Sequence, residues 1–176
     1  MNTSVKLIYM LGFEGRTLDE FISLLDNSGI RILVDIRSQP VSRMYPDFSM
    51  DNIRERFGQV GGVYHWAGRQ LGEQRQQDEK SINTSLDDPQ LRGFADFMQT
   101  EGFKRGMTNL VNLADKGLAG VLSEPRLAKN TQRELMADYL MLQGMHVLHL
   151  TDPGEACEHQ LDPRARRESV ELVYDQ

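Results

Sequence analysis

Charged and hydroxyl side chains follow directly after the segments whose apolar runs are typical of buried strands. Asp35 and Arg37 follow one such run, and Ser123 and Glu124 follow another. Arginine presents a planar fork of N–H donors that suits phosphate and carboxylate groups, and the N-terminus of a helix adds backbone N–H donors. These residue types at these positions predict a site for an anionic or phosphorylated ligand.

The candidate residues are divided by the chemistry that their side chains can perform. Three can exchange a proton and are the candidate acid–base groups, Asp35, His65 and Glu124. The others donate hydrogen bonds or leave room beside the backbone, and they are the ligand-binding candidates: Gly12, Arg16, Arg37, Ser38, Arg43, Arg69, Arg92 and Ser123. The structural alternative is that Asp35 pairs with Arg37 or Arg16 and that the other arginines are solvated or cover loops.

The four histidines are assigned by their place in the pattern. His65 lies near the end of a strand, so it is either a site residue or a buried core histidine. His146 and His149 fall inside a later strand, where we expect them to serve packing, and His159 falls in a loop from which it could reach the site.

The elements that must position these side chains alternate between strand and helix. The apolar run 7–11 predicts a strand that ends at Gly12. Thr17 and Glu20 then have the spacing of a capping box, which predicts a helix that ends at Gly29. The next strand is predicted at 32–34. A strand, a helix and a strand within about thirty residues imply a right-handed crossover and parallel pairing.

The same alternation continues to the end of the chain. The expected elements are a helix from Ser49 to 59, a strand at 63–66, a polar loop at 68–88, helix over 88–116 with a break at Gly102, a strand at 118–122, a helix from a second capping box at Thr131 and Glu134 to Gly144, a strand at 146–150 and a possible edge strand at 168–174. The pattern predicts a three-layer α/β/α sandwich with a mostly parallel sheet of about five strands plus a C-terminal edge strand. In such a sheet, ligands bind beyond the carboxyl ends of the strands.

Composition limits the protein class. The 176 residues suit one domain over residues 1–176. A single cysteine and four dispersed histidines match no zinc spacing, so we expect no structural metal and no cofactor. The net charge of −6 opposes non-specific nucleic-acid binding unless a local basic patch exists. No apolar stretch is long enough for a membrane span, and we expect a cytoplasmic protein.

Two stretches carry a resemblance to a known family. They are 33–43, which contains Asp-x-Arg-Ser-x-Pro-x-Ser-Arg and is followed by Pro46 and Phe48, and 92–100, which is followed by Phe103. Shorter pieces keep their order along the chain: Gly12 with Arg16, Tyr64-His65 before Leu71-Gly72, Arg133 with Ala137-Asp138, and 159–163. The chain resembles the domain-of-unknown-function 488 family.

The resemblance breaks at the reactive side chains. Phe13 stands where the family has a histidine, Leu122 stands in place of the cysteine of a Cys-x-Glu, and Thr131-Gln132 replaces a Cys-His pair. Leucine, threonine and glutamine cannot replace a thiolate or a proton-shuttling imidazole. The resemblance therefore implies a retained ligand site without thiol chemistry at these positions.

Three hypotheses follow. The first is a protein that binds an anionic small molecule, phosphate-bearing or nucleotide-like, or a nucleic-acid end. The second is an enzyme for a phosphorylated or nucleotide-like substrate with Asp35, Glu124 and His65 as acid–base groups. The third is a protein-interaction subunit, motivated by the acidic balance and nine methionines, although helical spacing favours core packing for Met136, Met141 and Met145. The sequence leaves open whether the protein forms a homodimer.

Overall fold

A six-stranded sheet in the order β3-β2-β4-β1-β5-β6 forms the centre of the structure, a computed structural model that describes residues 6–176. The strands are β1 (Leu7–Gly12), β2 (Ile32–Asp35), β3 (Val63–Trp66), β4 (Ala119–Ser123), β5 (His146–Asp152) and β6 (Glu155–Glu158). The first five are parallel, and β6 pairs antiparallel with β5. The predicted α/β sandwich with a mostly parallel sheet is confirmed.

Two helices cover one face of the sheet, and their starts are encoded locally. The helix α1 (Leu18–Asn27) has the predicted capping box, because the Thr17 side chain accepts from the Glu20 amide and the Glu20 side chain accepts from the Thr17 amide. The helix α2 (Met50–Gln59) is capped by Ser49, as predicted. A 3-10 turn, η1 (Pro46–Phe48), leads into α2.

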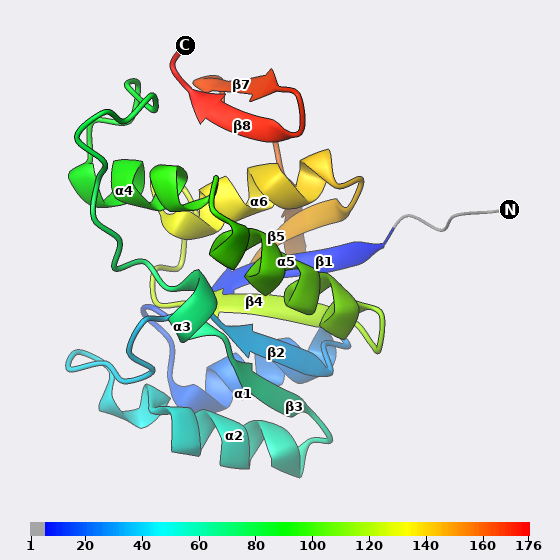
Figure 1. Cartoon of the computed structure of the whole chain (residues 1–176). Coiled ribbons are helices and arrows are strands. Elements are labelled where there is room, and N and C mark those ends of the chain that lie inside the picture. Colours follow the sequence, from blue (N-terminus) through cyan, green and yellow to red (C-terminus); the bar gives the residue numbers. More distant parts are fainter. Residues whose placement is uncertain (1–5) are drawn as a thin grey trace, which may run out of the picture.

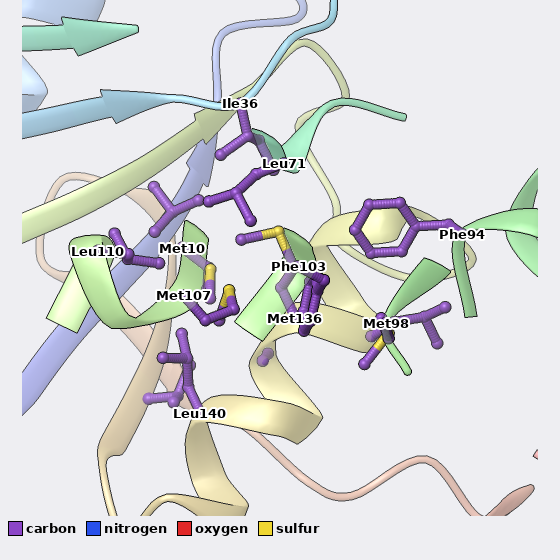
Figure 2. Packing of buried hydrophobic residues seen from close by; sticks show 14 of the residues in the cluster. Met10, Ile36, Leu71, Phe94, Met98, Phe103, Met107, Leu110, Met136 and Leu140 are labelled. Atoms are coloured by element: carbon purple, nitrogen blue, oxygen red, sulfur yellow. The ribbon is translucent and has the colours of Figure 1, made fainter. Parts of the chain in front are cut away.

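Three helices cover the opposite face (Figure 1): α4 (Pro89–Phe97), α5 (Glu101–Ala114) and α6 (Gln132–Leu142). Alternation along β1 divides the core between the two faces. Met10 packs with Met107 and Met136 from α5 and α6, as Figure 2 shows, whereas Leu11 packs on the side of α1 and α2. The buried apolar side chains therefore form one cluster on each side of the sheet.

Some expected boundaries need correction. The helical region 88–116 breaks before Thr100, whose side chain accepts from the Phe103 amide, and not at Gly102, which lies in the first turn of α5. Thr131 does not cap α6: its side chain accepts no hydrogen bond from the first turn of the helix, and its hydroxyl donates to the Ala128 carbonyl. The polar loop 68–88 contains a short helix, α3 (Gly68–Leu71).

The C-terminal tail does not extend the central sheet. It forms a separate hairpin of β7 (Ala165–Glu168) and β8 (Glu171–Tyr174), turning at Ser169 with a φ of 57°. The free edge of β5 is taken by β6, which follows it in the chain. The edge strand beside β5 is therefore β6 and not the tail, and β3 forms the other edge.

The connections after β2 and β4 leave the sheet on opposite faces. The chain runs from β2 to α2 on one face and from β4 to α6 on the other, although β2 and β4 are neighbours. Such a switch point opens a crevice beyond the carboxyl ends of the two strands. Within residues 6–176, no helix is long and apolar enough to cross a membrane.

Candidate functional site

A cavity of about 410 Å³ lies at this switch point, and we call it the β2–β4 cavity. Arg37 lines it from the loop after β2, and Ser123 and Glu124 line it from the end of β4. Ser38 lies beside it and is held by Glu73, whose carboxylate accepts from the Ser38 amide at 2.9 Å. Three of the residues expected at the site, Arg37, Ser123 and Glu124, are brought together here.

Asp35 and Arg37 form a buried ion pair beneath this cavity. Arg37 Nη2 lies 2.6 Å from Asp35 Oδ2, and Arg37 Nε and its backbone amide donate to Oδ1 at 3.0 Å. The Tyr64 hydroxyl donates to Asp35 Oδ2 at 2.6 Å, and burial raises the pKa of Tyr64 well above its usual value. Asp35 is fully buried and has four donors, so these contacts describe an anchor for Arg37.

The charge of the β2–β4 cavity is not that of an arginine-rich cleft. Among the described residues that line it, Arg37 is the one arginine, and its charge is balanced by Asp35. Three carboxylates line the same space, those of Glu73, Asp88 and Glu124. This cavity therefore offers an anion little net attraction.

Gly12 and Arg16 hold the ends of neighbouring strands together. A Cβ atom on Gly12 would lie 1.8 Å from the Pro125 carbonyl oxygen, so the backbone of the loop after β4 lies directly against β1. The Arg16 guanidinium donates to the Thr151 carbonyl and lies 3.5 Å from Asp152 Oδ1. Both residues thus have structural contacts at the carboxyl edge of the sheet.

The remaining expected residues lie elsewhere. Arg43 is exposed on the loop after β2, and Arg92 donates to the Leu86 and Thr84 carbonyls and holds that loop. Arg69 lines a separate surface cavity of about 310 Å³ with two further arginines, Arg75 and Arg105.

His65 lies on β3, where burial lowers its pKa and the nearby Lys116 lowers it further. Lys116 precedes β4 in the chain and therefore lies toward the amino edge of the sheet. His65 is not among the residues that line the β2–β4 cavity.

A second cavity of about 280 Å³ opens at the carboxyl edge on the other side of β4, against β1, β5 and α6. We call it the Arg133 cavity, and its polar lining includes Arg126, Lys129, Arg133, His149 and His159. Arg133 is 1% exposed. Its Nη1 donates to the Leu11 carbonyl at 2.8 Å and to Ser123 Oγ at 2.6 Å, and its Nη2 donates to the Arg126 carbonyl at 3.1 Å.

Arg133 is a buried cation without a counter-charge. No carboxylate of the described residues forms an ion pair with it, and residues 1–5 contain no Asp or Glu. Burial lowers the pKa of Arg133 to about 10, so the group is still charged at neutral pH. Its acceptors are neutral oxygens, which leave the cost of burying the charge largely uncompensated.

His149 and His159, which line the same cavity, belong to a chain of hydrogen-bonded side chains that continues into the protein. His149 Nε2 lies 2.8 Å from His159 Nδ1, and His159 Nε2 lies 2.7 Å from Asp138 Oδ1. The Tyr174 hydroxyl from the C-terminal hairpin donates to Asp138 Oδ2 at 2.8 Å. Burial, with His159 and Arg133 nearby, lowers the pKa of His149 to about 4, so His149 is neutral at neutral pH.

The expected site set omitted the residues of this second cavity. One signal for Arg133 was present, because a cation in the first turn of a helix opposes the helix dipole and needs another reason to be there. The sequence predicts that His149 serves packing and that His159 lies in a loop from which it could reach the site, without including either in the site set. No local pattern joins Asp138, His149 and His159, because their contacts depend on how α6, β5 and the following loop pack.

The fold is an open α/β sandwich with two cavities at the carboxyl edge of its sheet. The family model described as "Domain of unknown function DUF488" matches residues 17–140, and the chain belongs to this family. No curated protein and no solved structure gives a significant match.

Proposed function

We propose that this protein binds a small anionic ligand, a carboxylate or a phosphate, in the Arg133 cavity. The observation that carries the proposal is the pair of buried nitrogens without a partner. Among the described residues, three buried side-chain nitrogen or oxygen atoms lack a hydrogen bond, and two of them, Arg133 Nε and His149 Nδ1, belong to residues that line this cavity. Such atoms are costly unless a ligand or water satisfies them.

The free donors of Arg133 match an oxyanion. A guanidinium has five N–H groups. In this protein, two hydrogen bonds from Nη1 and one from Nη2 are accepted by protein oxygens. The remaining donors are on Nε and Nη2, two neighbouring nitrogens that can bind two oxygens of one carboxylate or phosphate. An anion here would also supply the charge that Arg133 lacks.

The charge around the cavity supports the same ligand class. Three cationic side chains line it, those of Arg126, Lys129 and Arg133, against one carboxylate, that of Glu134. Arg126 pairs with Asp152, whereas Lys129 is exposed and forms no ion pair with a described residue. The local field therefore favours an anion although the whole chain is acidic.

The two other hypotheses have weaker support. Asp35 has all its hydrogen-bonding capacity engaged by Arg37 and Tyr64, which leaves the enzyme hypothesis with Glu124 as its acid–base group in the β2–β4 cavity. Met136 and Met145 are buried in the core and Met141 is half-buried, so they do not form an adaptable docking surface.

The test is the melting temperature of the protein in increasing inorganic phosphate, at constant ionic strength, for the wild type and Arg133→Lys. A ligand that binds only the folded state stabilises it by about 2.7 kcal/mol at a hundredfold excess over Kd, which raises the melting temperature of a chain of this length by roughly 5–10 °C. Lysine keeps the charge but lacks the planar fork, so we expect its response to need at least about tenfold more phosphate.

The matched control is Arg54→Lys, because Arg54 is an exposed helix arginine outside the cavity. Its response should equal that of the wild type and reports the general stabilisation by phosphate salts. If Arg133→Lys fails to fold, Lys129→Gln at the same cavity takes its place, with a smaller loss expected. An equal saturating response in the wild type and the cavity variant would contradict the proposal.

A further inference from the structure

The chain of histidines fixes which atom His149 presents to the ligand. Asp138 accepts from three donors, the Tyr174 hydroxyl, the Asp162 amide at 3.1 Å and His159 Nε2. Asp138 Oδ1, which already accepts from the Asp162 amide, is the acceptor for His159 Nε2, so a proton of His159 is on Nε2. With this as its only ring proton, His159 has an acceptor at Nδ1.

The same logic continues to the next ring. Because His159 Nδ1 is then the acceptor, His149 Nε2 carries the proton of the hydrogen bond between the two rings. A neutral His149 carries one proton only, so its Nδ1 atom presents a lone pair. Nδ1 is the atom that has no partner in the protein, and the ring lines the Arg133 cavity.

Arg133 and His149, which both line the cavity, carry unlike groups. Arg133 offers N–H donors and a positive charge, which call for an anionic oxygen, whereas His149 offers an acceptor, which calls for a hydroxyl. An anion whose oxygens are all deprotonated would turn a lone pair toward the lone pair of His149. An anion that keeps one proton satisfies both groups.

We propose that His149 makes the site selective for an oxyanion that carries its own proton, hydrogen phosphate in particular, over oxyanions of the same shape and charge that carry none. This inference rests on the proposed function, because Arg133 must first bind the anion. Asp138 and His159 act as positioning residues, since they hold His149 in the tautomer that leaves Nδ1 unprotonated.

The test compares inorganic phosphate with sulfate by isothermal titration calorimetry on the wild-type protein, at about pH 8, where both anions are mainly dianions and imidazoles are neutral. Because a hydrogen bond to a charged group contributes more than one order of magnitude in affinity, we expect phosphate to bind at least about tenfold more tightly than sulfate. Methyl phosphate is an ester that has lost its P–OH proton at this pH, so it should bind as weakly as sulfate. Its affinity therefore shows whether the site takes free phosphate or a phosphate ester.

Two variants test the role of the histidines. An amide can turn either its oxygen or its nitrogen to a ligand, so His149→Asn should bring the ratio of phosphate to sulfate affinity close to one. His159→Gln should lower the ratio as well, because His149 then loses the acceptor that fixes its tautomer. His146→Asn is the matched control, since His146 lies on the same strand but contacts Glu158 outside the cavity, and its ratio should stay that of the wild type.

The outcomes separate this inference from the proposed function. Equal wild-type affinities for phosphate and sulfate, with proton uptake from the buffer when sulfate binds, would overturn the selectivity but leave the Arg133 site intact. Binding of neither anion would overturn both proposals. A tenfold preference that persists in His149→Asn would assign the selectivity to another residue.

Discussion

Asp35 and Arg133 are both buried charged residues, but only one of them has a partner of opposite charge. The carboxylate of Asp35 accepts hydrogen bonds from Nε and Nη2 of Arg37, so the two charges compensate one another inside the protein. Arg133 has carbonyl and hydroxyl oxygens as its only partners among the described residues. The first arrangement is complete in the absence of ligand, and the second gains from an anion.

The buried pair leads to a prediction about stability. Asp35→Asn leaves the Arg37 charge buried without its counter-ion, and breaking a buried pair in this way typically lowers the free energy of unfolding by about 3–5 kcal/mol. The control is Asp51→Asn, in an exposed pair with Arg54, where we expect a change of about 0.5 kcal/mol or less. Urea unfolding measures both. A loss below about 1 kcal/mol in Asp35→Asn would show that the pair is not a structural anchor.

At the scale of elements, the loop between β4 and α6 contributes to both cavities. Glu124 lines the β2–β4 cavity, Arg126 lines the Arg133 cavity, and Pro125 between them lies against Gly12 at the end of β1. The Arg126 carbonyl also accepts from Arg133. The position of this loop therefore depends on the absence of a side chain at residue 12.

Gly12→Ala should consequently destabilise the protein. Its Cβ would meet the Pro125 carbonyl oxygen at 1.8 Å, so the loop must move, and overpacking of this kind costs about 1–3 kcal/mol or more. The control is Gly58→Ala inside α2, where a Cβ meets nothing within 4 Å and alanine should stabilise the helix by about 0.5–1 kcal/mol.

Thermal or urea unfolding of the two variants checks the opposite signs. If Gly12→Ala were as stable as the wild type, the close approach of β1 and the β4–α6 loop would not be a constraint. Weaker phosphate binding by Gly12→Ala would show that the loop between β4 and α6 also positions residues that line the Arg133 cavity.

At the scale of the whole molecule, the sequence predicts the elements better than it predicts the site. The capping box of Thr17 and Glu20 and the apolar runs of the strands are local signals, and they yield the parallel sheet and its flanking helices. The carboxyl edge, at which we propose that the ligand binds, follows from this topology. The edge strand β6 was missed because 155–158 has no apolar alternation, and its residues are exposed.

The site depends on contacts between residues far apart in the chain. Arg133 donates to Leu11, 122 positions away, and Tyr174 donates to Asp138, 36 positions away. Sequence spacing carries no record of such pairs, which arise when α6 packs against β1 and the C-terminal hairpin. The sequence shows which arginines lie near strand ends, but only the three-dimensional structure shows which of them has a counter-ion.

Binding of an oxyanion by the free donors of Arg133 can be followed through the ¹⁵N–¹H resonance of Arg133 Nε during a titration with inorganic phosphate. We predict a saturable shift of this resonance and slower exchange of its proton with water, while the corresponding resonance of Arg37, which already donates to Asp35, stays in place. An unchanged Arg133 resonance at phosphate concentrations that stabilise the protein would place the anion elsewhere and contradict the account.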